Sequence, residues 1–171
     1  GIFHNLHYGT ASPFTLINNN ITGLSDANET NWDGILLTSL SVGSLSQDNI
    51  IDGTNLSQSE GYEVWNVKNT KPAVINGGSV RGVKYGLSVN NFAGYNSDAT
   101  DGAHAIVSKL SVNNCQNGIL IQDDPMSSHA LVHALIQDDC EMINAGTGTG
   151  LLITGAKSSV NLNENDASIH G

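Results

Sequence analysis

The sequence predicts an all-β fold, a solenoid in which short parallel strands stack in about five to six coils. Five times, a glycine opens a short segment in which the first and third residues after the glycine are large and apolar. The gaps between these glycines are 27, 25, 32 and 32 residues, and a strand that recurs with such a period is typical of a solenoid. The five segments span residues 34–37, 61–64, 86–89, 118–121 and 150–153.

Alternation along each segment assigns its apolar residues to the inside of the coil, because successive side chains of a strand point to opposite faces. We expect one continuous parallel sheet with an interior stack of Ile35, Tyr62, Leu87, Ile119 and Leu151. The residue between each apolar pair then faces outward, and three of these five residues are leucines, namely Leu36, Leu120 and Leu152. An outward apolar row predicts either a covering segment, for which the insertion at 92–105 is the candidate, or a contact with another subunit.

Signals for helices are almost absent, because no stretch keeps an apolar stripe of helical period over three turns. A second apolar stretch precedes each glycine-led segment and supplies the other strands of the coil. We expect residues 14–155 to form the solenoid. Residues 1–13 are expected to form an N-terminal cap or a segment that donates a strand to a neighbour, and residues 156–171 a C-terminal cap or tail.

The run from Leu110 to Ile121 combines an apolar strand, an Asn-Cys turn and the segment Gly-Ile-Leu-Ile. In this it resembles the repeat of pectin lyase-like proteins, and the resemblance covers roughly residues 14–155 at the level of the repeat pattern. It implies a right-handed parallel β-helix. It does not select a function, because that fold carries lyases, hydrolases, phage tailspikes, adhesins and structural filaments.

The charge balance excludes some classes of partner. The 171 residues include 16 acidic and 6 basic ones, for a formal net charge of −10 at pH 7. Such a surface repels nucleic acids and anionic membranes, and no apolar run is long enough to span a membrane. We therefore expect no nucleic-acid partner and no membrane insertion. Low Lys with abundant Asn, Ser, Thr and Gly favours an extracellular or cell-surface location.

Two acidic pairs are the candidates for catalysis. The segment 137–146 resembles the Asp-Asp-Cys turn of polygalacturonase-type hydrolases, in which paired carboxylates perform acid–base chemistry, and Asp138 and Asp139 are the matching residues. Asp123 and Asp124 form a second pair. The Gly-His-Gly turn of that family reads Gly-Thr-Gly in this chain, and its Arg-x-Lys cation is missing. We therefore expect both pairs to be turn residues, with catalysis as the alternative.

Cys115 and Cys140 lie 25 residues apart and each follows a polar pair, which predicts equivalent positions in neighbouring coils. Stacked residues have Cα atoms about 4.8 Å apart, within the range that a disulfide tolerates. The sequence is compatible with a disulfide between the two cysteines and equally with two buried free thiols.

Three sequons, at Asn20, Asn28 and Asn55, are candidates for glycosylation in a secreted chain. No cofactor is expected. Acidic turns at 98–101 and 161–166 could offer oxygen ligands to Ca²⁺, although neither has the fixed ligand spacing of a calcium loop.

These features favour a non-enzymatic structural or adhesive module outside the cell, which associates with copies of itself as the subunit of a filament or surface layer. A solenoid has unpaired strand edges at both ends, and such edges invite another chain. The alternative is a polysaccharide-active enzyme, either a hydrolase or a lyase, or a carbohydrate-binding segment of a trimeric tailspike. Glycans are accordingly the second class of partner, after copies of the chain itself.

Overall fold

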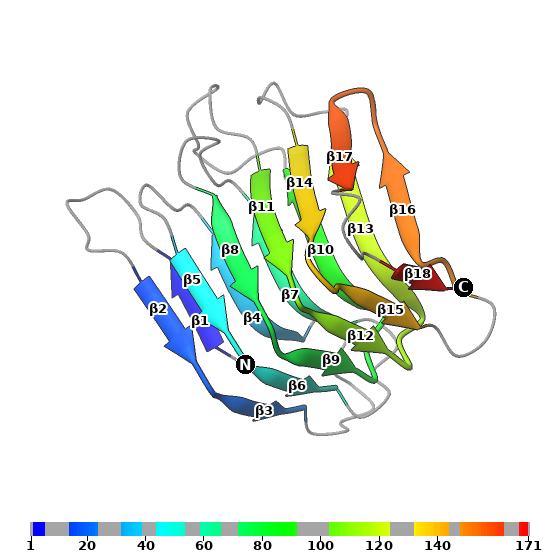
Figure 1. Cartoon of the computed structure of the whole chain (residues 1–171). Coiled ribbons are helices and arrows are strands. Elements are labelled where there is room, and N and C mark those ends of the chain that lie inside the picture. Colours follow the sequence, from blue (N-terminus) through cyan, green and yellow to red (C-terminus); the bar gives the residue numbers. More distant parts are fainter. Residues whose placement is uncertain are drawn as a thin grey trace.

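The computed structural model describes residues 2–5, 14–23, 32–38, 44–53, 59–65, 72–91, 103–123, 132–143, 148–162 and 168–170. These residues form strands and turns, and none of them belongs to a helix long and apolar enough to cross a membrane. The strands form three parallel sheets of six strands each, so the chain passes through each sheet six times (Figure 1).

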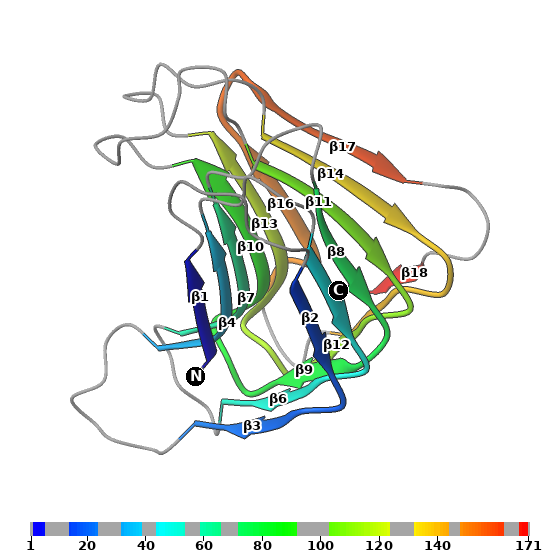
Figure 2. The ribbon, with the colours of Figure 1, turned by 90° about the vertical axis from the view of Figure 1, so that its left-hand side faces the viewer.

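Each pass contributes one strand to every sheet. Sheet A contains β1 (Ile2–Asn5), β4 (Asp33–Thr38), β7 (Glu60–Trp65), β10 (Tyr85–Asn91), β13 (Asn117–Asp123) and β16 (Leu151–Thr154). Sheet B contains β2 (Phe14–Ile17), β5 (Ser44–Gln47), β8 (Ala73–Asn76), β11 (Ala103–Ser108), β14 (Val132–Gln137) and β17 (Ser158–Leu162). Sheet C contains β3 (Asn20–Thr22), β6 (Ile50–Asp52), β9 (Ser79–Arg81), β12 (Ser111–Asn113), β15 (Glu141–Ile143) and β18 (Ser168–His170). Figure 2 shows sheets A and B facing each other, with sheet C joining them along one side.

Sheet A confirms the predicted parallel stack. Ile35 pairs with Tyr62, Tyr62 with Leu87, Leu87 with Ile119, and Ile119 with Leu151. The first four side chains are fully buried, whereas Leu151, in the last strand, is partly exposed. Inward rows from all three sheets meet in one apolar core. The prediction of an all-β parallel solenoid is therefore confirmed.

Regular strand pairing extends beyond residues 14–155. β1, from the segment 1–13, pairs with β4, and β17 and β18, from the segment 156–171, pair with β14 and β15. These two segments therefore supply the first strand of sheet A and the last strands of sheets B and C.

The repeated glycines occur where successive coils approach too closely for a side chain. A methyl group on Gly61 would lie 2.6 Å from the carbonyl oxygen of Gly86 and would also overlap the side chain of Val80 in the core. A methyl group on Gly34 would lie 2.7 Å from the carbonyl oxygen of Gly61. We call the stacked residues the glycine ladder, which consists of Gly34, Gly61, Gly86, Gly118 and Gly150. Steric exclusion explains why the repeat begins with glycine.

The turns from sheet B to sheet C explain the polar clusters between the apolar stretches. The residue that directly follows each of the first five strands of sheet B has a positive φ, between 47° and 73°. These residues are Asn18, Asp48, Gly77, Lys109 and Asp138. Asn, Asp and Gly adopt this left-handed conformation more readily than other residues, so four of the five turns carry a residue type that suits the geometry.

Candidate functional sites

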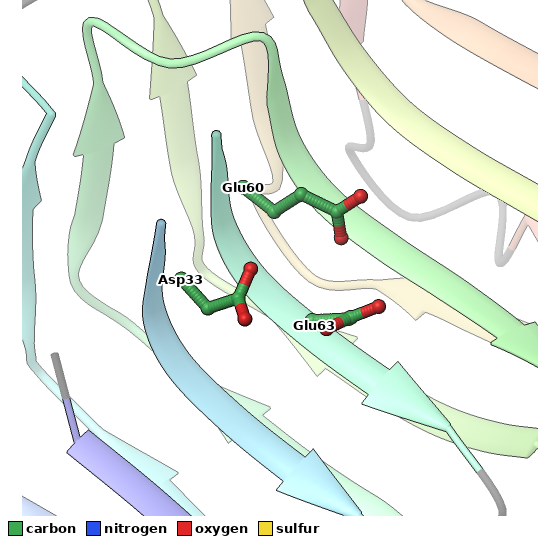
Figure 3. Close-up of side chains that lie close together, drawn as sticks. All are labelled: Asp33, Glu60 and Glu63. Atoms are coloured by element: carbon green, nitrogen blue, oxygen red, sulfur yellow. The ribbon is translucent and has the colours of Figure 1, made fainter. Parts of the chain in front are cut away.

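Three carboxyl groups meet on sheet A. Asp33 opens β4, Glu60 opens β7, and Glu63 lies three residues further along β7 (Figure 3). Asp33 and Glu60 are register partners on neighbouring strands. One oxygen from each side chain lies within 4.8 Å of the oxygens of the other two. We call Asp33, Glu60 and Glu63 the carboxyl cluster.

The cluster belongs to the face of sheet A that points away from the core. Glu63 pairs with Leu36 on one side and Ser88 on the other, in the row predicted to face outward. Leu36 and Leu120 in this row lie outside the core cluster of apolar side chains, yet they expose only 8% and 6% of their surface. Leu36 and Leu120 are therefore covered, whereas Leu152 is partly exposed.

The low exposure of this row arises within a single chain, so it favours the covering-segment alternative for Leu36 and Leu120. Most of the predicted cover, the insertion at 92–105, lies outside the described residues. Leu120 and Leu152 are register partners, as their places in adjacent repeats predict.

Burial raises the pKa of all three carboxyl groups in the cluster. The pKa of Glu60 rises to about 8, because burial disfavours the charged form and because Glu63 and Asp33 repel it. Burial, followed by repulsion from Asp33, raises the pKa of Glu63 to about 7. The pKa of Asp33 is raised by burial, and its hydrogen bond with Glu63 opposes this rise. The cluster therefore retains protons near neutral pH, and its members titrate together.

The surrounding donors do not satisfy the cluster. Asn90 Nδ2 donates to Glu63 Oε1 at 3.3 Å and to Ser88 Oγ at 2.8 Å, and the Ser88 hydroxyl bonds to Glu60. Glu60 Oε2 is buried without a hydrogen-bond partner, as is Asn90 Oδ1. A buried carboxylate oxygen without a donor costs free energy, whereas a protonated carboxyl group supplies its own donor. The hydrogen bonding thus agrees with the raised pKa values.

Within the described ranges, the carboxyl cluster is the group that brings together three potential metal ligands. Carboxylate oxygens suit hard cations such as Ca²⁺. The turn at 98–101, predicted as a calcium candidate, lies outside the described residues, and the turn at 161–166 is described only at 161 and 162.

The predicted acidic pairs lie in other parts of the solenoid. Asp138 and Asp139 are exposed in the turn after β14, both with positive φ. Asp123 is buried at the end of β13, where its Oδ1 accepts a hydrogen bond from Asn91 Nδ2 at 3.1 Å and its Oδ2 one from the backbone N of Lys157 at 3.2 Å. Asp124 lies outside the described residues. Asp123 therefore connects β13 to the preceding coil through Asn91 and to the turn between β16 and β17 through Lys157.

Cys115 and Cys140 are buried free thiols. The prediction that they occupy equivalent positions is wrong, because Cys115 follows β12 whereas Cys140 precedes β15, the strand that pairs with β12. Ser111 pairs with Glu141, so one coil here spans 30 residues rather than 25. The spacing of the two cysteines therefore places them at opposite ends of a pair of strands.

We expect both thiols to react slowly with a thiol reagent in the folded chain. Burial raises the pKa of both thiols, which lowers the fraction of reactive thiolate. Denaturation without a reductant should release both thiols for titration, and Cys115→Ser or Cys140→Ser should leave one. An unreduced, denatured sample without a titratable thiol would instead reveal a disulfide.

Among the predicted glycosylation sites, Asn20 lies on β3 and is exposed. Asn28 and Asn55 lie outside the described residues.

A second candidate site is the surface at the end of the solenoid formed by β16 and β17. Ile153 pairs with Ile121, and Leu162 pairs with Ile136. Ile121 and Ile136 are fully buried, whereas Ile153 and Leu162 expose 42% and 47% of their surface. These two side chains occupy core positions by register, and they are exposed because β16 and β17 are the last strands of their sheets. We call Leu151, Ile153, Val160 and Leu162 the C-terminal end.

Comparison of the chain with protein-family models, with curated proteins and with solved structures gives no match.

Proposed function

We propose that this chain is a structural or adhesive module outside the cell, a β-solenoid that associates with copies of itself rather than an enzyme. The observation that carries the proposal is the C-terminal end, where Ile153 and Leu162 continue rows of the core and stay open to solvent. Exposed apolar patches on a protein surface generally mark contact sites. Among the described strands, β16 and β17 pair on one side only, so their outer backbone edges add N–H and C=O groups to the same surface.

The polysaccharide-active alternative has weaker support. The carboxyl cluster contains the kind of acidic groups that glycoside hydrolysis uses. However, Glu63 is 9% exposed and its neighbour Ser88 is fully buried, so a sugar chain would reach these groups only after their cover had moved. The repeat pattern of the sequence supports the resemblance to pectin lyase-like proteins, and the amino-acid composition supports the extracellular location.

We expect the chain to form assemblies at high protein concentration, and Ile153→Asp combined with Leu162→Asp to convert them to monomers. A carboxylate in an apolar contact loses hydration without gaining a partner, so association should weaken. Sedimentation velocity over a concentration series measures the assembly, and circular dichroism checks that the strands remain.

The matched control is Ile50→Asp combined with Ile143→Asp. These isoleucines are about equally exposed, at 47% and 44%, but they lie on strands that pair on both sides. The control should therefore assemble like the unmodified chain. An unmodified chain that stays monomeric at the highest concentration would refute the proposed function.

A further inference from the structure

We infer that copies of the chain stack head to tail, so that the C-terminal end of one copy receives the first coil, formed by β1, β2 and β3, of the next. This inference rests on the proposed function and names the partner surface. Stacking of this kind continues all three parallel sheets from one copy into the next. Because it joins two different surfaces, the contact is heterologous and repeats along an open filament.

The register of the sheets specifies which residues would meet. Successive pairings along sheet A run from Ile2 to Leu151, those along sheet B from Leu16 to Leu162, and those along sheet C from Ile21 to Ile169. One further step of the same repeat places Ile2 of the next copy beside Leu151, Leu16 beside Leu162, and Ile21 beside Ile169. These three junction pairs are apolar, whereas the same step places His4 of the next copy beside Ile153.

The two ends differ in what they offer. The C-terminal end offers the strongly exposed Ile153 and Leu162. In the first coil Ile21 is buried, and Leu16 is partly exposed while packing against the core on its other side. Leu16 and the outer backbone edges of β1, β2 and β3, each the outermost strand of its sheet, therefore form the complementary surface.

Charge favours a second copy as the occupant. The six outermost strands, β1, β2, β3, β16, β17 and β18, contain no Asp, Glu, Lys or Arg, although the chain has a net charge of −10. Sheet edges that remain unpaired commonly carry charged residues or proline as protection against pairing. These edges lack charged residues, so stacking sets no like charges against each other along the paired strands. A partner must also present three parallel strands with the spacing of this solenoid, and the first coil does so.

Disulfide trapping tests the predicted register. Thr15 and Asn161 are exposed and occupy the same row of sheet B at its two ends. Within one chain, four intervening coils separate Thr15 from Asn161, and the register partners between them are Leu45, Val74, Ile106 and Leu135. In stacked copies, the Cα atoms of Asn161 in one copy and Thr15 in the next would lie about 4.8 Å apart. Mild oxidation of the double variant Thr15→Cys/Asn161→Cys should therefore give a ladder of covalent multimers on a non-reducing gel, because that distance suits a disulfide.

The matched control is Ile17→Cys/Asn161→Cys. Ile17 is exposed on the same face, two residues out of register, at a diagonal distance of about 7–8 Å that a disulfide does not span without backbone movement. We expect about tenfold less cross-linked product from this control, and none from the single variants. Peptide mapping should find positions 15 and 161 joined between different chains.

The outcomes separate the two proposals. If the unmodified chain assembles in sedimentation but the two double variants cross-link equally, or neither does, head-to-tail stacking is wrong and the proposed function stands. If the unmodified chain is monomeric and neither variant forms multimers, both are wrong.

Discussion

Raising the pH from about 5 to about 9 is expected to destabilise the folded chain, and Glu60→Gln combined with Glu63→Gln should remove most of this loss. The native pKa values of about 8 and about 7 lie above the ordinary value of 4.5. Between about pH 4.5 and about pH 8 the native state therefore binds more protons than the unfolded state. The free energy of unfolding consequently falls as pH rises through this window.

The contribution of these groups is fully present below about pH 4.5, where both states are protonated, and is lost above about pH 8. One pKa unit corresponds to about 1.4 kcal/mol, so the coupled pair should account for a loss on the order of 3–5 kcal/mol after allowance for residual solvent screening. At pH 9 the double variant should be more stable than the unmodified chain, because glutamine cannot ionise.

Thermal or urea unfolding at a series of pH values measures this slope. Glu141→Gln, which changes an exposed glutamate on β15, is the matched control and should leave the slope unchanged. A double variant with the same pH dependence as the unmodified chain would show that the cluster does not retain its protons on folding.

The sequence predicted the stack of Ile35, Tyr62, Leu87 and Ile119 because all four follow the same glycine and alternate with outward residues. It did not reveal the carboxyl cluster, because strict alternation places Glu60 and Glu63, three residues apart, on opposite faces of a strand. The structure breaks this alternation at the glycine. Gly61 and Tyr62 both face the core, so the residue before the glycine turns to the same side as Glu63.

A pattern in the sequence does point to the cluster once this bend is known. Asp33 and Glu60 both stand directly before the glycine of consecutive repeats, and the next repeat places Tyr85 there. Register stacks such residues on adjacent strands, so two acidic residues at this position predict a close carboxyl pair.

The sequence left the cover over Leu36 and Leu120 open and misplaced the two cysteines, because neither feature follows from the strand pattern alone. The cover over Leu36 and Leu120 cannot be derived from alternation within sheet A, since alternation assigns a face but not what packs on that face. The cysteines were compared by their local polar neighbours, whereas their true relation depends on insertions that lengthen the coil between β12 and β15. The face to which a side chain points follows from the few residues around it, whereas the pairing between neighbouring coils depends on the length of the whole coil.

Gly61→Ala should destabilise the fold by about 2–4 kcal/mol, in spite of the general tendency of this substitution to stabilise. Where space allows, replacing glycine by alanine reduces the freedom of the unfolded chain and stabilises by about 0.4–1 kcal/mol. Gly61 has no positive φ, so backbone conformation alone would permit alanine. The added methyl group would, however, lie 2.6 Å from the carbonyl oxygen of Gly86, which is backbone and cannot rotate away.

The sign of the effect therefore distinguishes two explanations of the repeat. If the glycine ladder exists because coils touch there, Gly34→Ala and Gly86→Ala should destabilise the fold as well. The methyl carbon added at Gly34 would lie 2.7 Å from the carbonyl oxygen of Gly61, and the one added at Gly86 would lie 2.8 Å from the carbonyl oxygen of Gly118. Gln122→Ala, at an exposed position on β13 of the same sheet, should change the free energy of unfolding by less than about 0.5 kcal/mol. Urea unfolding followed by circular dichroism measures all four. Stabilisation by alanine at Gly61 would mean that the coils do not touch at the glycines, and the ladder would lose its role in setting the repeat.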